Sequence, residues 1–470
     1  MSRVVTYRKL NRLLRIVVNT SDKFLKRKNC IQMVALLVTM VMGLAAHSQP
    51  QWLRKTEDPE YLHRAVKLLT DIMVHDIYSP PVASRTYAYV SVAAYETLVP
   101  SNSNYVSLAG RVHGLQPAPA PVPAVQYSFT LAAVQAMLTV GKSMVISEAV
   151  MDNFRQTVIQ TMKADGMPGS VMDSSLAYGS RVAAHILSWA AADHYLQTRS
   201  LPKYAVNNAP GYWKPTPPAY IKAVEPHWNQ LRPFLIDAAQ FKPSPPPSFS
   251  TDTASRFYKE ANAVYYAGKG LTSEQTAIAS FWDCNPFKVN LRGHVMFATK
   301  KISPGGHWIN ITAMACRQLQ KDVVATAEAY AFAAIGIADA FISCWDEKYR
   351  SNVIRPETYI NQYIDVDWLP LLQTPPFPEY TSGHSVVSAC AAEILTSLFG
   401  DHFSYVDATE TEFDLPPRRF SSFRQAAEEA AISRFYGGIH YMPSIKNGLD
   451  EGTAIGKYVV EKLNIKQGTF

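Results

Sequence analysis

Cationic, hydroxyl and imidazole side chains gather in three short segments of the C-terminal third of this 470-residue chain. In the first segment Lys348 and Arg355 lie seven residues apart, so both side chains can project from one face of a helix. Pro356 follows and disfavours a helix that continues through Arg355. This spacing is compatible with one wall of an anion site, or with an ordinary solvated helix face.

The second segment is the triplet Ser382-Gly383-His384, which stands directly before the apolar run 385–399. The run predicts a helix, so the triplet lies at a helix N-terminus, where free backbone N–H groups and the positive end of the dipole favour anions. A hydroxyl, a glycine that allows close approach of the backbone, and an imidazole occur there together. The alternative is an ordinary N-cap serine followed by a surface histidine.

The third segment contains Arg434 and His440. A helix predicted from about Phe423 ends at the pair Gly437-Gly438, which leaves Arg434 in its last turn and His440 just beyond it. An arginine there also interacts favourably with the helix dipole, and a lone histidine is often structural. Taken together, the three segments supply the cations, the hydroxyl and the imidazoles that a cage for a tetrahedral oxyanion needs.

In their order and internal spacing, these segments resemble the three-part motif of the vanadium-dependent haloperoxidases and the related type 2 phosphatidic-acid-phosphatase-like acid phosphatases, most closely over residues 345–444. The resemblance implies a set of groups that bind the oxygens of vanadate or phosphate: Lys348, Arg355, Ser382, the backbone N–H of Gly383, and Arg434. It also implies that His440 binds vanadium or, in a phosphatase, attacks phosphorus. His384 would be the acid–base group.

Two positions depart from the family pattern. Thr381 stands where a proline usually precedes the triplet, and Ser444 stands where an aspartate often follows the ligand histidine by four residues. Such an aspartate would orient His440 through its second ring nitrogen. Two further positions, Trp345 and Phe377, resemble the aromatic residues beside vanadate in chloroperoxidase-type members and are candidates for a halide pocket; their alternative is core packing.

The resemblance therefore implies a haloperoxidase that oxidises halide with hydrogen peroxide and has vanadate as its cofactor. One alternative is an acid phosphatase that acts on a small phosphate ester, with His440 as nucleophile. Another is a non-catalytic protein that binds the oxyanion without turnover.

The elements that must position these residues are helices. Apolar residues recur at three- and four-residue spacing in a series of segments: 61–74, 83–98, 127–140, 148–164, 175–191, 253–267, 272–282 and 323–345. The Ala-rich run 325–340 is apolar nearly all round, as a central helix should be. Proline-rich connectors occupy 116–123 and 242–247. We predict an all-α fold of two helical bundles, 49–245 and 246–470, with the site in the second; the resemblance implies a fold similar to vanadium chloroperoxidase.

Charge is concentrated at the N-terminus. Residues 1–30 hold nine Lys or Arg against one Asp, while the remaining 36 basic and 37 acidic residues nearly balance, so no basic face for nucleic acid is expected. The apolar run 31–46 follows, with small residues at its end, which predicts a signal peptide over 1–48 and export to the periplasm or the medium. The run is short for a bilayer span of roughly 20 residues; membrane attachment is expected only if this segment stays uncleaved.

The cysteines and the other histidines carry no recognisable metal pattern. No two cysteines have CxxC spacing, so neither a zinc nor a redox site is predicted from the sequence. Export permits disulfides but does not require them. Four cysteines follow the predicted cleavage point: Cys284, Cys316, Cys344 and Cys390. Nine further histidines are interpreted as structural or surface residues: His63, His75, His113, His185, His194, His227, His294, His307 and His402.

Overall fold

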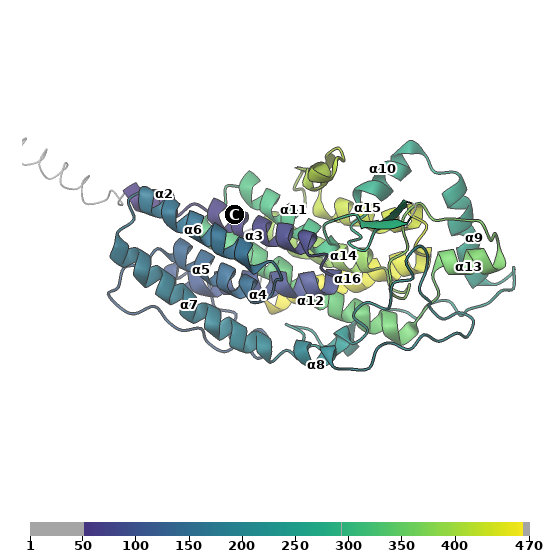
Figure 1. The fold of residues 1–470 in the computed structure, drawn as a ribbon, viewed down its shortest axis with the longest axis horizontal. Helices are drawn as coiled ribbons and strands as arrows, with labels where there is room; N and C mark the ends of the chain where they lie inside the picture. The colour runs from purple at the N-terminus through teal and green to yellow at the C-terminus, as the bar shows by residue number, and fades with distance from the viewer. Residues whose placement is uncertain (1–50, 293, 464–470) are drawn as a thin grey trace, which may run out of the picture. The chain divides into compact units, whose positions relative to one another are not determined.

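The computed structural model describes residues 51–292 and 294–463 (Figure 1). The predicted signal peptide, residues 1–48, lies outside these residues. From Lys55 onward the chain forms one compact unit, and helix α2 (Gln51–Thr56) includes its first residues. The unit is built mainly of helices, which confirms the predicted all-α fold.

A described helix overlaps every segment that the sequence predicts as helical, with ends that differ by up to three residues in 127–140, 253–267 and 272–282. The first half of the chain contains α3 (Glu60–His75), α4 (Pro80–Leu98), α5 (Phe129–Lys142), α6 (Glu148–Ala164), α7 (Gly169–Ala191) and α8 (Tyr195–Arg199). The second half contains α9 (Arg256–Lys269), α10 (Ser273–Phe281), α11 (Pro304–Gln318), α12 (Val323–Ser351), α13 (Pro356–Tyr363), α14 (Gly383–Phe399), α15 (Phe423–Tyr436) and α16 (Met442–Lys462). The sequence does not predict α2, α8, α11, α13 or α16.

Short elements connect these helices. Two antiparallel hairpins pair β1 (Val289–Arg292) with β2 (Val295–Ala298), and β3 (Tyr405–Asp407) with β4 (Arg418–Phe420). Single turns of 3₁₀ helix form η1 (Val99–Ser101), η2 (Trp228–Gln230), η3 (Ala238–Phe241) and η4 (Thr409–Phe413). The connectors 116–123 and 242–247 contain no helix, as predicted.

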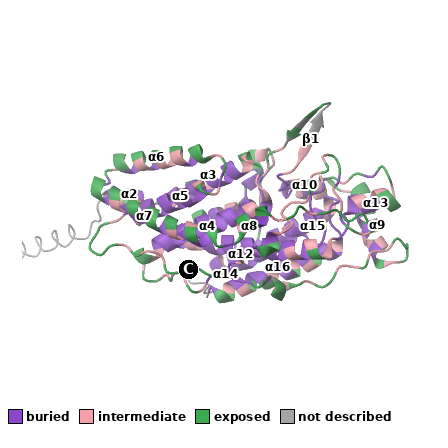
Figure 2. Ribbon diagram, turned by 60° about the horizontal axis from the view of Figure 1, so that its bottom comes forward, coloured by how far each residue is buried: buried purple, intermediate pink, exposed green. Residues whose placement is uncertain are grey.

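Helix α12 is the central helix expected from the Ala-rich run. Asp322 begins it, because its carboxylate accepts hydrogen bonds from the N–H groups of Val324 and Ala325. Asn352 ends it in the left-handed conformation, with φ of 49°. The helix is long and apolar enough to cross a membrane, but 94% of its apolar window is buried inside the protein (Figure 2). It is therefore a core helix, packed against α4, α11 and α14.

Helices α14 and α16 approach closely because α16 presents glycines at every fourth position: Gly448, Gly452 and Gly456. A Cβ added at Gly452 would lie 2.1 Å from the carbonyl oxygen of Val386, and one at Gly456 would lie 2.8 Å from that of Cys390. No side chain fits in that space. This contact holds the N-terminus of α14 beside the start of α16, where the N–H of Ser382 donates to the carbonyl of Ser444 at 3.2 Å.

Helices from both predicted bundles pack on each other. Helix α4, from the first, contacts α12 and α11, from the second. The border near residue 245 stays a prediction.

Candidate functional site

The three segments with candidate site residues meet between α12, α14 and α15. Lys348 lies in the last turn of α12, and Arg355 caps α13 in an extended conformation before Pro356. Ser382 is the N-cap of α14, where its Oγ accepts from the N–H of Ser385 at 3.3 Å. Arg434 lies in the last turn of α15. Ser382 and Arg434 lie where the sequence predicts them. Lys348 and Arg355 do not share one helix face, because α12 ends at Ser351 and Arg355 lies beyond it.

The chain reverses between Arg434 and His440 through a left-handed glycine. Gly438 has φ of 75°, which a side chain adopts only at a cost, and Ile439 N–H then bonds back to the Arg434 carbonyl at 3.2 Å. The turn places His440 directly before α16, buried beside Arg355.

A small cavity of about 30 Å³ lies where these residues converge. Of the candidate residues, six line it: Trp345, Phe377, Gly383, His384, Arg434 and His440. The rings of Trp345 and Phe377 pack against each other with centroids 4.9 Å apart, so they form one aromatic wall. The structure thus brings together the predicted halide pocket, the two histidines and one predicted oxyanion cation.

His440 is held by a carboxylate that the sequence does not single out. Its Nδ1 lies 2.8 Å from Oε1 of Glu379, an oxygen that also accepts from the N–H of Tyr441 at 3.0 Å. Ser444, which stands where the resemblance leads one to expect an aspartate, lies 3.3 Å from the same nitrogen. Glu379 therefore supplies the orienting carboxylate that the sequence pattern lacks.

The second nitrogen of His440 faces a donor. Arg355 Nη1 approaches Nε2 at 3.2 Å, an arrangement that requires a lone pair on Nε2 and the proton on Nδ1. Burial, followed by the charges of Arg355 and Lys348, lowers the pKa of His440 well below its ordinary value. The imidazole is therefore neutral, and Nε2 is suited to be a metal ligand.

Several buried donors of this site lack a partner among the described residues. Arg355 is fully buried and donates through Nε to the Phe377 carbonyl and through Nη1 to the Ile439 carbonyl, yet Nη2 is unpaired. Arg434 donates through Nη1 to the Trp282 carbonyl at 2.8 Å, and its Nε is unpaired. Nε2 of His384 is buried and unpaired too, but in the neutral ring, whose other nitrogen bonds the backbone of Trp282, it is an acceptor. Since buried donors are rarely left without a partner, a bound oxyanion fits this site.

Lys348 and Ser382 have protein partners instead. The Lys348 ammonium donates to the carbonyls of Pro378 and Glu379, each at 3.1 Å, and to that of Thr381. Burial lowers its pKa to about 8. Neither residue lines the small cavity, so their binding of oxyanion oxygens stays a prediction.

His384 is anchored through a tryptophan carbonyl that the sequence also misses. Its imidazole hydrogen-bonds the backbone of Trp282, the residue whose carbonyl accepts from Arg434. Burial, followed by the charge of Arg434, lowers the pKa of His384 well below its ordinary value. A neutral imidazole with an unpaired Nε2 can take up a proton from a group in the cavity.

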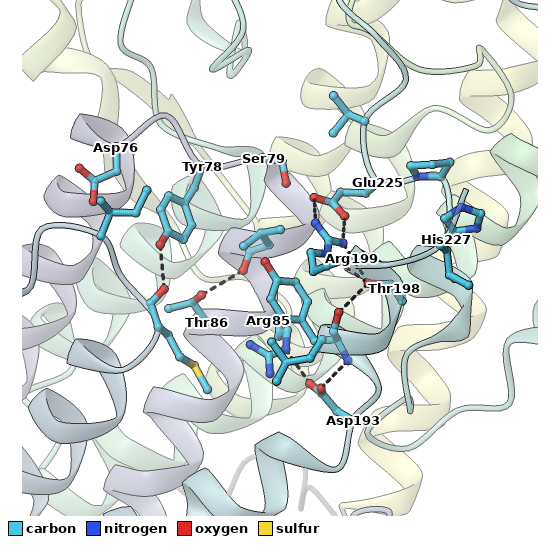
Figure 3. A pocket seen from close by; sticks show the side chains of 18 of the residues that line it. Asp76, Tyr78, Ser79, Arg85, Thr86, Asp193, Thr198, Arg199, Glu225 and His227 are labelled. Atoms are coloured by element: carbon cyan, nitrogen blue, oxygen red, sulfur yellow. Dashed lines mark hydrogen bonds and ion pairs between the residues drawn. The ribbon is translucent and has the colours of Figure 1, made fainter. Parts of the chain in front are cut away.

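A second cavity, of about 940 Å³, is lined by residues of the first half of the chain and by Phe287 (Figure 3). Phe287 lines both cavities, and the indole N–H of Trp345 donates to the carbonyl of Val224, a residue of the larger cavity, at 3.2 Å. The wall of the larger cavity contains two ion pairs, Arg85 with Asp193 and Arg199 with Glu225. The two cavities therefore lie on either side of Phe287, and Trp345 contacts a residue of the larger one.

Comparison with known proteins agrees with this geometry. A family model described as the second helical-bundle domain of VCPO matches residues 361–467. The crystal structure of a bacterial vanadium-dependent iodoperoxidase is 49% identical, with a TM-score of 0.83 over 88% of this chain and 99% of that one. A bacterial vanadium-dependent chloroperoxidase, in its holo form, is 18% identical, with a TM-score of 0.62 over 83% of this chain and 95% of that one, and shares the fold. A search among curated proteins gives no match. The identity and coverage of the first structure establish that this chain belongs to the vanadium-dependent haloperoxidase family.

Proposed function

We propose that this haloperoxidase uses iodide as its halide, and that its vanadate is held at His440. The observation that carries the site is the pair of unpaired buried donors, Arg355 Nη2 and Arg434 Nε. Beside them are His440, whose Nε2 carries a lone pair, and His384, whose Nε2 is unpaired. The choice of iodide is supported by the 49% identity to a structure described as an iodoperoxidase.

Different residues of the site would bind the vanadium and the oxygens of vanadate. Bound vanadate supplies a Lewis acid that activates hydrogen peroxide toward halide. His440 would bind vanadium through Nε2, with Glu379 holding its Nδ1 proton. Arg355 and Arg434 would donate to the oxyanion oxygens, which offsets their charge in a water-poor site.

His384 would move the proton of the peroxide. Its imidazole is neutral because burial and Arg434 lower its pKa, so Nε2 can accept a proton first and return it later. A bound anion beside Nε2 raises the pKa of the imidazole again, which favours proton uptake when the site is loaded.

The aromatic wall suits a weakly hydrated anion. Trp345 and Phe377 line the cavity, and the Lys348 ammonium and the Arg355 guanidinium each lie 5.1 Å from the centre of the Phe377 ring. Iodide is the least strongly hydrated of chloride, bromide and iodide, so moving it from water against aromatic carbon costs least. The two nearby cations offset its charge.

Halide competition tests the proposal directly. Protein purified without phosphate is loaded with orthovanadate and given hydrogen peroxide with iodide, bromide or chloride; the vanadate-free protein is given p-nitrophenyl phosphate. We expect iodide oxidation that depends on vanadate and far exceeds the other two rates. Equal turnover of bromide or chloride would contradict the choice of iodide. Ester hydrolysis without halide oxidation would indicate the phosphatase alternative, and tight vanadate binding without either activity would indicate a binding protein.

We also propose that the enzyme acts outside the cytoplasm, in the periplasm or the medium. The support is the basic segment 1–30, the apolar run 31–46 and the small residues that follow it.

A further inference from the structure

A group of side chains of the types that ligate metals lies behind the oxyanion cavity. Cys284 follows α10, His307 lies in α11 and Glu410 lies in η4, and all three are buried. His307 Nδ1 is 3.5 Å from Cys284 Sγ and 3.2 Å from Glu410 Oε1, and Sγ and Oε1 are 4.0 Å apart. One sulfur, one nitrogen and one oxygen thus surround a single point.

The spacing matches that of metal ligands. Zinc bonds of about 2.0–2.3 Å in a tetrahedral arrangement place neighbouring ligand atoms roughly 3.3–3.6 Å apart. Two of the three distances lie within about 0.1 Å of this range, and the third needs only a small shift of the Glu410 side chain. The combination of thiolate, imidazole and carboxylate is a zinc ligand set.

Two further contacts point to a cation here. Oε2 of Glu410 is buried and has no partner among the described residues, although its carboxylate is fully removed from solvent. A cation bound to Oε1 would lie close to this oxygen as well, and a water molecule would be the fourth ligand. On the far side of the ring, Nε2 of His307 lies 2.8 Å from Oδ2 of Asp407. Metal-bound histidines commonly give their other ring nitrogen to a carboxylate in this way.

We propose that Cys284, His307 and Glu410 form a structural site for one zinc ion, with Asp407 orienting the histidine. The ion takes the place of the His307 Nδ1 proton and of the Cys284 thiol proton, both of which leave to solvent on binding. The competing arrangement has no metal and a protonated His307 that bridges Asp407 and Glu410 as a buried ion triplet. The two arrangements differ in whether the protein holds zinc.

The site would brace one wall of the oxyanion cavity. The ring of His307 stacks on Trp282, with centroids 4.5 Å apart and planes at 23°. The carbonyl of Trp282 accepts from Arg434, and Cys284 itself lines the small cavity. Zinc would therefore join the end of α10, helix α11 and η4 directly behind the groups that hold Arg434 and His384.

Metal content tests the proposal. The full chain is produced without a polyhistidine tag in zinc-supplemented medium, purified without vanadate, and measured by plasma mass spectrometry. We expect about one zinc ion per chain in the unaltered protein and none in Cys284→Ala. The control is Cys316→Ala, which removes a different buried thiol, in α11, and should keep the zinc. Unaltered protein without zinc, or zinc retained in Cys284→Ala, would overturn the proposal in favour of the ion triplet.

A second measurement needs no variant. Protein produced with cobalt(II) in place of zinc should show the near-ultraviolet charge-transfer absorption of a thiolate bound to cobalt, together with the visible bands of a four-coordinate ion. Cobalt bound without the thiolate band, or no bound cobalt, would overturn the assignment of Cys284. Neither result depends on halide oxidation or on vanadate.

Discussion

The protonation of His440 is fixed by its two neighbours. Glu379 holds the Nδ1 side at 2.8 Å, and Arg355 faces Nε2 at 3.2 Å. A carboxylate on one ring nitrogen orients the ring and makes the other nitrogen a better ligand. The family's usual aspartate is Ser444 here, so this chain performs the same orientation from the loop before α14 instead of from α16.

Replacing the carboxyl group of Glu379 with an amide should weaken vanadate binding. For Glu379→Gln we expect vanadate affinity to fall about 10- to 100-fold, the usual effect of removing a partner of a metal ligand, measured by titration. The control is Glu347→Gln, because Glu347 is also a buried glutamate but lies on α12. Adding Ser444→Asp to Glu379→Gln should restore much of the loss, since Ser444 lies 3.3 Å from Nδ1. An unaltered affinity in Glu379→Gln would remove Glu379 from this role.

The two histidines should fail differently. His440→Ala removes the proposed vanadium ligand, so activity should be lost while the cations still retain part of the oxyanion affinity. His384→Ala removes the proposed acid–base group, so vanadate should still bind while turnover falls roughly 10²- to 10⁴-fold. Vanadate titration and iodide oxidation, measured on both variants, separate the roles. Loss of vanadate in His384→Ala, together with activity in His440→Ala, would reverse the assignment.

At the scale of elements, apolar periodicity and capping residues predict where single helices begin and end. The N-terminus of α14 at Ser382 and the last turn of α15 at Arg434 follow from an apolar run, an N-cap and a glycine pair. Glu379 and Trp282 cannot be found by sequence reasoning, because the residues that they bind, His440 and Arg434, lie 61 and 152 positions away. The cysteine–histidine–glutamate group escapes it for the same reason, since Cys284 and Glu410 are 126 positions apart. Patterns with fixed short spacing cannot detect contacts that only the packed helices create.

The close contact of α14 with α16 should be sensitive to one methyl group. A Cβ at Gly452 would overlap the Val386 carbonyl, so Gly452→Ala must push the helices apart. We expect a loss of about 1–3 kcal/mol in the free energy of unfolding, the usual cost of overpacking, and weaker vanadate binding because Ser382 and His384 begin α14. Gly169→Ala is the matched control: a Cβ there meets no atom within 4 Å. Equal urea midpoints for the two variants would show that the contact tolerates the methyl group.

For the whole molecule, the N-terminal charge pattern predicts processing during export. The mature protein should begin near Gln49. Mass spectrometry of periplasmic or secreted protein should therefore detect no peptides from residues 1–46. Recovery of those peptides from the membrane fraction would support an uncleaved anchor instead.

The pH dependence of the free energy of unfolding should show whether His384 is neutral in the folded protein. Burial and Arg434 lower the pKa of His384 well below 6.5, whereas in the unfolded chain a histidine takes up a proton near pH 6.5. Below that pH the unfolded state gains a proton that the buried imidazole does not, so His384 favours unfolding increasingly as the pH falls. Other buried groups titrate as well, so the comparison must isolate one residue. Relative to His384→Gln, we expect the vanadate-free protein to lose about 1 kcal/mol of stability between pH 7.5 and pH 5.5, measured by urea unfolding of both. His402→Gln, at an exposed histidine, is the control. If the difference between the unaltered protein and His384→Gln stays constant across this range, then His384 is protonated as readily in the folded site as in the unfolded chain, and the proton-transfer role argued from its neutrality fails.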